Sequence, residues 1–122
     1  MADANTHYPR VIQPQLSADL RLYPVVAVMG ARQVGKSTIC QEIAEAHGFA
    51  RRTLDDRDVR EQAIADPEGF LADFGDGGAF IDEVQRAPDL MLAIKGVVDR
   101  DGRNGQYLVS GSNQPKVGKS VS

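Results

Sequence analysis

The sequence contains little cysteine, and this limits its chemistry. Cys40 is the only cysteine among the 122 residues, so the chain cannot form an internal disulfide. Chains without disulfides are typical of reducing compartments, and we therefore expect a cytoplasmic protein. Cys40 lies in a segment with helical spacing, where we expect it to be a small buried side chain rather than a reactive thiol.

Long apolar runs, a targeting segment and an excess of positive charge are also missing. No run of the sequence approaches the roughly 20 apolar residues that span a membrane, and the polar N-terminal residues lack the apolar core of a signal peptide. The formal net charge of −3 gives no electrostatic case for nucleic-acid binding. We therefore expect a protein that contacts neither a membrane nor nucleic acid.

The rest of the composition is that of one ordinary globular domain. Hydrophobic residues make up 42% of the chain and charged residues 25%, and a chain of 122 residues is long enough for one modest core. We expect a disordered N-terminus at residues 1–9, one folded core at residues 10–113 and a flexible tail at residues 114–122.

The strongest motif is a complete match to the phosphate-binding pattern G-x-x-x-x-G-K-[ST]. It consists of Gly30, Ala31, Arg32, Gln33, Val34, Gly35, Lys36, Ser37 and Thr38. The two glycines allow successive backbone N–H groups to point at one anion. Lys36 supplies a positive charge for the β- and γ-phosphates, and the Ser37 hydroxyl is suited to bind Mg²⁺. The motif predicts a nucleotide-binding loop.

The residues on both sides of this loop fit that prediction. Val25 to Met29 form a short apolar stretch, which predicts a strand buried on both faces of a parallel sheet. Ile39 and Ile43 follow the loop at helical spacing, and Gly48 is a candidate end of that helix. The order of strand, loop and helix would direct the positive end of the helix dipole at the phosphates.

Strands and helices alternate along the remaining chain. We predict strands near residues 49–54, 79–81 and 107–109, and helices around residues 59–64, 67–74 and 88–98. A short helix beginning at Pro14 should carry Leu16, Leu20 and Tyr23 on one stripe. This alternation predicts an α/β fold with a parallel sheet, in which ligands bind at the carboxyl ends of the strands.

Polar residues follow each predicted strand at that position. Asp55 follows the second strand, Asp82 and Glu83 the third, and Ser110 the fourth. Asp82 is a candidate Mg²⁺ ligand acting through a water, opposite Ser37. Glu83 is a candidate to accept a proton from the water that attacks the γ-phosphate, or to orient that water. The alternative is an acidic strand end that only meets solvent or caps the next turn.

Several of these segments together resemble a known family. They are Gly30 to Thr38, Thr53 to Asp56, Phe80 to Pro88, Ile94 to Asp99 and Leu108 to Ser112. They resemble the AAA-type ATPase core of a prokaryotic family of predicted ATPases, whose members usually continue into a C-terminal domain of unknown function. The resemblance implies a three-layer P-loop fold of the ASCE type with the strand order 5-1-4-3-2.

The resemblance also implies roles for particular residues. Lys36 and Ser37 match the Walker A positions, Asp82 and Glu83 match Walker B, and Ser110 stands at the sensor-1 position after the fourth strand. The bound nucleotide is then expected to be ATP with Mg²⁺, since no guanine-reading Asn/Thr-Lys-x-Asp element is found in the sequence. Arg86, Arg100 and Arg103 are candidate arginine fingers because they lie near strand ends.

The sequence departs from the family pattern at its C-terminal side. It stops soon after the fourth strand, so we expect the fifth strand and the helical lid to be missing from a truncated core. Val25 to Met29 would then form an apolar sheet edge, which favours self-association. Without a lid, only the segment around Val11 and Ile12 could cover the adenine, and we expect weak nucleotide affinity.

Three functions remain open from the sequence. The leading one is Mg²⁺-dependent ATP binding with slow hydrolysis. A second is a nucleotide-gated switch that changes the contact with an unknown protein partner without significant turnover. A third is a relic domain that binds nothing.

Overall fold

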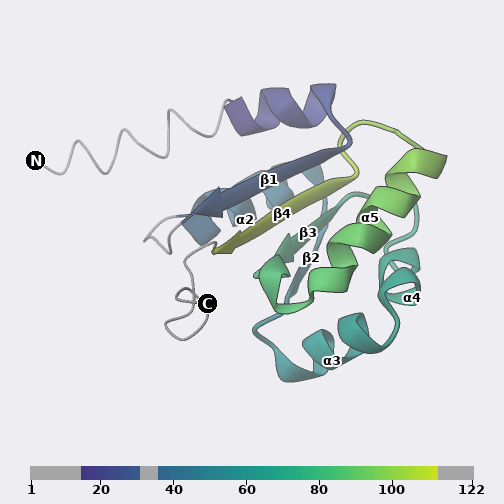
Figure 1. Cartoon of the computed structure of the whole chain (residues 1–122). Helices are drawn as coiled ribbons and strands as arrows, with labels where there is room; N and C mark the ends of the chain where they lie inside the picture. The colour runs from purple at the N-terminus through teal and green to yellow at the C-terminus, as the bar shows by residue number, and fades with distance from the viewer. Residues whose placement is uncertain (1–14, 31–35, 113–122) are drawn as a thin grey trace, which may run out of the picture.

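The computed structural model describes residues 15–30 and 36–112, in which four strands alternate with helices (Figure 1). The strands are Val25–Gly30 (β1), Ala50–Thr53 (β2), Ala79–Asp82 (β3) and Tyr107–Ser112 (β4). The helices are residues 15–22, Lys36–His47 (α2), Arg57–Ala65 (α3), Pro67–Ala72 (α4) and Pro88–Arg100 (α5), with a short 3₁₀ turn at Val84–Arg86 (η1). Each strand and helix expected from the sequence is present, with small shifts at the ends.

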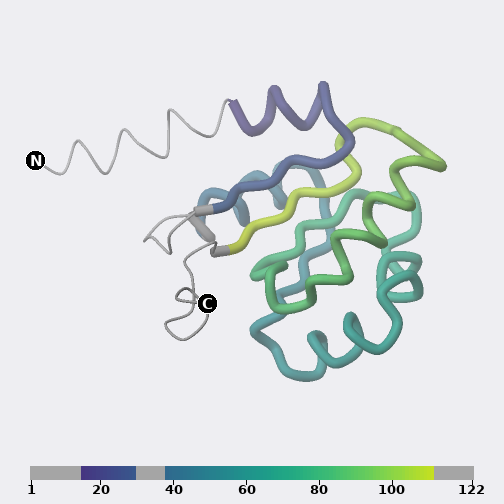
Figure 2. Tube along the Cα trace, in the orientation of Figure 1, coloured from purple at the N-terminus to yellow at the C-terminus, as the bar shows by residue number. Residues whose placement is uncertain are grey.

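The four strands form one parallel sheet in the order β1-β4-β3-β2. This confirms the predicted α/β class and agrees with the expected order 1-4-3-2 of the first four strands. Figure 2 shows β1 and β4 running side by side along their length. Among the described residues β1 has a strand neighbour on one side only, so it forms an edge of the sheet.

Helices cover both faces of the sheet and give the predicted three layers. Alternation along each strand sends neighbouring side chains to opposite faces, so Phe80 and Ile81 belong to different cores. Phe80 packs with α2 and the helix at residues 15–22, whereas Ile81 packs with α3, α4 and α5. The sheet is therefore the shared wall of two apolar cores.

Side-chain caps explain where α3 and α4 begin. The carboxylate of Asp56 accepts hydrogen bonds from the backbone N–H groups of Asp58 and Val59, at the start of α3. Asp66 accepts from the N–H of Gly69 at 3.1 Å and so caps α4, as its position before Pro67 predicts. These caps satisfy N–H groups that have no partner inside the helix.

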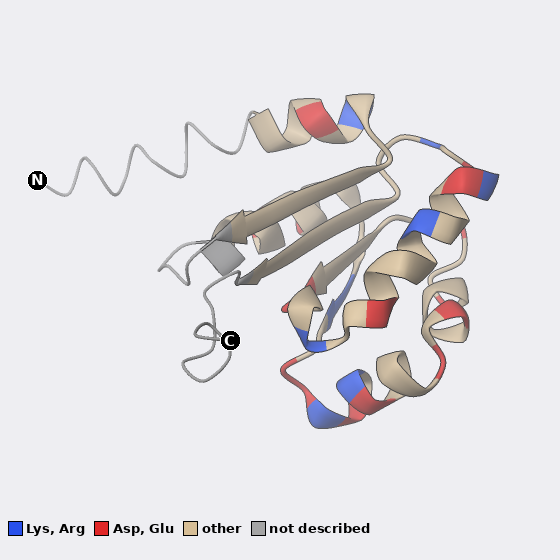
Figure 3. Ribbon diagram, viewed as in Figure 1, with Lys and Arg blue, Asp and Glu red and all other residues tan. Residues whose placement is uncertain are grey.

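Charged residues lie away from the middle of the sheet. Figure 3 shows β1, β3 and β4 almost without charge, while the edge strand β2 carries Arg51 and Arg52, which are both exposed. No helix among residues 15–30 and 36–112 is both long and apolar enough to cross a membrane.

Two predictions about packing are wrong and one is confirmed. β1 is not buried on both faces, because it lies at the sheet edge: Met29 is 43% exposed. Tyr23 follows the first helix instead of belonging to its buried stripe and is 55% exposed, although Leu16 and Leu20 are buried as predicted. Cys40 is fully buried in α2, as expected for a small core side chain. The predicted disordered N-terminus, the adenine-covering segment and the predicted tail lie outside the described residues.

Candidate functional site

The carboxyl end of the sheet brings together residues that are far apart in the sequence. Thr53 of β2 is paired with Asp82 of β3, and Val28 of β1 is paired with Ser110 of β4. A hydrogen bond from Ser110 to Asp82 joins the two pairs, so the four positions form a row across all four strands. β1 continues past this row to Gly30, the first residue of the phosphate-loop motif.

Asp82 is held between two hydroxyl groups. Ser110 Oγ donates to Asp82 Oδ1 at 2.6 Å, and Thr53 Oγ1 donates to Asp82 Oδ2 at 3.2 Å. Ser110 is fully buried, and Asp82 is partly buried. Both carboxylate oxygens are therefore fixed in direction by neighbouring strands, while each oxygen keeps further acceptor capacity.

Glu83 leaves the strand in a different direction from Asp82. Its backbone is in the left-handed region, with φ 60° and ψ 45°, and the residue is only 5% exposed. This conformation is uncommon for a residue other than glycine. The carboxylate accepts a hydrogen bond from Gln85 Nε2 at 2.6 Å. The two adjacent acids therefore have different partners, as expected if they have different roles.

The phosphate-loop motif is only partly described. Gly30 ends β1, and Lys36 and Ser37 are the first residues of α2, so the expected order of strand, loop and helix is present. Ala31, Arg32, Gln33, Val34 and Gly35 lie outside the described residues, as do the side chains of Lys36 and Ser37. Thr38 is in α2 and exposed. The role of these nine residues in phosphate binding stays a prediction.

An ion pair also lies at the carboxyl end of the sheet. Arg86 Nε and Asp55 Oδ1 are 2.8 Å apart, so the acid that follows β2 is bound by a residue from η1. Their side chains are 37% and 47% exposed respectively.

The other two candidate arginine fingers are at the wrong end of the sheet. Arg100 ends α5 and Arg103 lies in the connection before β4, so both are at the amino ends of the strands. Arg103 Nη1 donates to the carbonyl of Asp76, which precedes β3. Proximity to a strand end was the reason for selecting them, and the sequence did not indicate which end they would occupy.

Two residues at the site were not identified from the sequence. Thr53 lies in a segment that resembles the family, but neither Thr53 nor Gln85 has a role that the sequence pattern predicts. A signal for Thr53 exists, because it is a hydroxyl residue at the end of a predicted strand. The contact of Gln85 depends on the left-handed turn at Glu83, which the sequence does not reveal.

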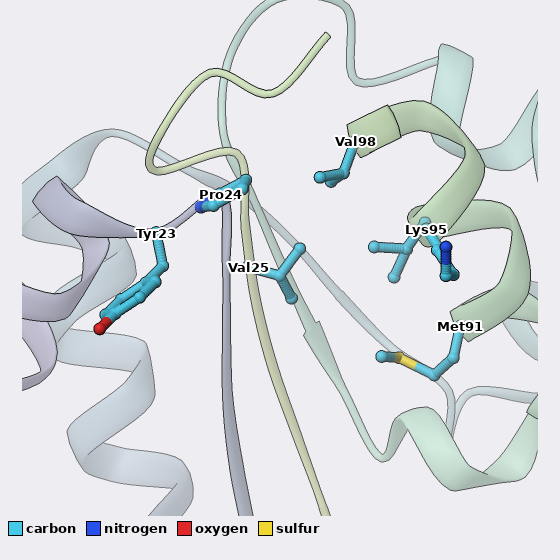
Figure 4. A pocket seen from close by; sticks show the side chains of 7 residues that line it. Tyr23, Pro24, Val25, Met91, Lys95 and Val98 are labelled. Carbon is cyan, nitrogen blue, oxygen red and sulfur yellow. The ribbon is translucent and has the colours of Figure 1, made fainter. Parts of the chain in front are cut away.

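A hollow in the described part of the chain lies away from this site. It has a volume of about 310 Å³ and lies between the start of β1 and α5. Figure 4 shows the side chains of Val25, Met91 and Val98 facing this space, whereas the ring of Tyr23 turns away from it. The hollow is almost entirely apolar and contains none of the polar groups described above.

Comparison with known proteins identifies the group to which this chain is related. The chain is 35% identical over 105 residues to an uncharacterized protein of Mycobacterium bovis and, with the same identity, to one of Mycobacterium tuberculosis. Each alignment covers 84% of this chain and 23% of the relative, so the chain spans about a quarter of their length. The family model described as an AAA domain matches residues 22–122, which contain the whole sheet. The fold is that of a P-loop nucleotide-binding domain, and the chain belongs to the AAA-domain family.

Proposed function

We propose that this chain binds ATP together with Mg²⁺ at the carboxyl end of the sheet and hydrolyses it slowly. Membership of the AAA-domain family supports a nucleotide-binding function of the ATPase type. The observation that carries the finer proposal is the pair of acids at the end of β3. Asp82 is oriented by hydroxyls from both neighbouring strands, and the adjacent Glu83 is buried and held by an amide.

The chemistry of the donors suits Mg²⁺. This ion prefers oxygen ligands, and proteins usually bind it with one or two carboxylates and leave the remaining positions to water and phosphate. Asp82 offers one such carboxylate, and the Ser37 hydroxyl would be the second protein group. When bound, Mg²⁺ would neutralise negative charge on the phosphates. Ser110 and Thr53 would hold the carboxylate of Asp82 in one orientation.

Glu83 is the residue proposed to act on the attacking water. A carboxylate within hydrogen-bond reach of a water can accept its proton or orient it, and such groups contribute about 10²- to 10⁴-fold to rate. Burial removes competing solvent from Glu83, which is 5% exposed. Lys36 would balance the charge of the β- and γ-phosphates from the start of α2.

Phosphate release from Mg-ATP tests this proposal. We expect slow turnover by the wild-type chain and at least a 100-fold loss in Glu83→Gln, with ATP binding retained. Lys36→Ala should lose binding itself, which isothermal titration would measure. Glu42→Gln is a matched control, because Glu42 is an exposed acid on α2 and its substitution should leave turnover unchanged. Equal phosphate release from wild type and Glu83→Gln would contradict the role of Glu83, and equal binding heats from wild type and Lys36→Ala would contradict the site.

A further inference from the structure

We infer that Gln85 is a positioning residue for Glu83, and that Gly111 of β4 provides the space in which its amide sits. This inference rests on the proposed function, because it assigns a role to Gln85 in the same reaction. It concerns the orientation of the Glu83 carboxylate and not the binding of nucleotide.

The first observation is the contact itself. Gln85 Nε2 donates to Glu83 Oε1 at 2.6 Å, and the two residues are separated by Val84 alone. Side chains at positions i and i+2 do not face each other in a regular helix. In a regular strand they point to the same face of the sheet, in parallel directions, and do not turn toward each other. Here the left-handed backbone at Glu83 and the 3₁₀ turn after it bring the two side chains together.

The second observation is that the Glu83 side chain does not serve the turn that it begins. Glu83 is the N-terminal cap residue of η1, but its side chain makes no capping hydrogen bond there. The turn is held by its backbone instead, with Arg86 N–H donating to the Glu83 carbonyl and Ala87 N–H to that of Val84, both at 3.1 Å. The carboxylate is therefore bound by Gln85 and is not used as a structural cap.

The third observation is the close fit of Gly111 against Gln85. A Cβ atom added at Gly111 would lie 2.4 Å from Gln85 Oε1 and 3.1 Å from the terminal carbon of Met29. The first distance is far below an ordinary contact, so any residue other than glycine would force the amide to move. Ser110, the preceding residue, holds Asp82. Adjacent positions of β4 thus control both acids, Ser110 directly and Gly111 through Gln85.

A neutral amide is well suited to this task. Its capacity to donate a hydrogen bond does not depend on pH, because glutamine does not titrate. A catalytic base whose orientation is fixed by a third group is a recurring arrangement in enzymes, and small misplacements of such a base reduce turnover strongly. We expect loss of the Gln85 amide to lower kcat by about 10- to 100-fold and to leave KM for Mg-ATP within about twofold.

The experiment compares three substitutions in the full chain. Gln85→Ala removes the amide, Gln85→Glu keeps its shape but replaces the donor by a second carboxylate, and Gly111→Ala leaves Gln85 in place while occupying its space. Gln62→Ala is the control, since Gln62 is exposed on α3. All three test variants should lose kcat with KM preserved, and the control should match the wild type. Thermal unfolding should show that Gln85→Ala remains folded, so that its loss of rate is not a loss of protein.

A double-mutant cycle separates positioning from other effects. In the Glu83→Gln background, adding Gln85→Ala should change the residual rate by less than about twofold, because the two residues act through one contact. If the losses of rate in Glu83→Gln and Gln85→Ala multiply in the double variant, the two residues act independently and the inference is overturned. An increase in kcat in Gln85→Ala would also overturn it. Turnover that is lost in Glu83→Gln but unchanged in Gln85→Ala would overturn the inference alone. Absence of turnover in the wild type would overturn it together with the proposed function.

Discussion

The two ends of the sheet use polar side chains in different ways. At the amino end, most of the side-chain contacts are with the main chain: Gln106 donates to the carbonyls of Asp101 and Arg103, and Asn104 donates to that of Arg21. Arg103 also pairs with the carboxylate of Asp101 there, at 2.9 Å. At the carboxyl end, side chains bind each other, through the contacts Thr53 to Asp82, Ser110 to Asp82 and Gln85 to Glu83. The first arrangement holds loops in place, and the second arrangement holds carboxylates in a chosen direction.

The two ends of the sheet also differ in the kind of ionisable side chain that is buried there. Tyr107 begins β4 at the amino end, and burial raises the pKa of its hydroxyl, although the nearby charges of Arg103 and Arg100 act to lower it. A neutral phenol in an apolar setting is typical of structural packing. At the carboxyl end, the partly buried Asp82 and the buried Glu83 are acids. The comparison predicts that substitutions at one end change stability and that substitutions at the other change activity.

The largest expected effect is on activity and comes from Asp82→Ala. Removing this carboxylate should reduce Mg²⁺-dependent turnover at least 100-fold, because the candidate ion ligand is lost. It also leaves the Ser110 and Thr53 hydroxyls without their acceptor, at a cost of about 1–3 kcal/mol in the free energy of unfolding. Phosphate release and denaturant unfolding would measure the two effects. Asp76→Ala is the control, because Asp76 contacts Arg103 through its backbone carbonyl and the substitution leaves that group in place. An unchanged rate of phosphate release in Asp82→Ala would contradict the difference in function between the two ends.

A smaller effect, now on stability, is expected from Gln106→Ala at the amino end. Gln106 is 6% exposed and binds two carbonyl groups, so its loss should lower the free energy of unfolding by about 1–3 kcal/mol. The affinity for Mg-ATP should stay within about twofold of wild type, because no element of the site changes. Urea unfolding and nucleotide titration on the same protein would check this. A large loss of affinity without loss of stability would show that the two ends are not separate in function.

The smallest effect is expected from Arg86→Gln. The ion pair between Arg86 and Asp55 is partly exposed, and such pairs contribute about 0–1 kcal/mol to stability. Turnover should change by less than about threefold, because Asp55 already binds this arginine within the same chain. Arg57→Gln is a matched control, since Arg57 forms an exposed pair with Glu61 on α3. A fall of 100-fold or more would instead identify Arg86 as a residue that contacts the phosphates.

The sequence was sufficient to predict the elements, but not the contacts between side chains. A short apolar run predicted β1, helical spacing predicted α2 and α5, and the family resemblance supplied the strand order. The link of Thr53 with Asp82 depends on the register of β2, and the link of Gln85 with Glu83 depends on one left-handed residue. Neither is encoded in a local pattern. The same reason applies to Arg100 and Arg103, because the sequence shows that they lie near strand ends but not which edge of the sheet they reach.

Backbone amide NMR shifts on addition of Mg-ATP test the central claim most directly, because they report both ends of the sheet in one measurement. The account predicts the largest shifts at Gly30, Asp82 and Gly111, with Gln106 and Arg103 almost unmoved. Shifts confined to the amino end, or no shifts at millimolar Mg-ATP, would contradict a nucleotide site at the carboxyl end.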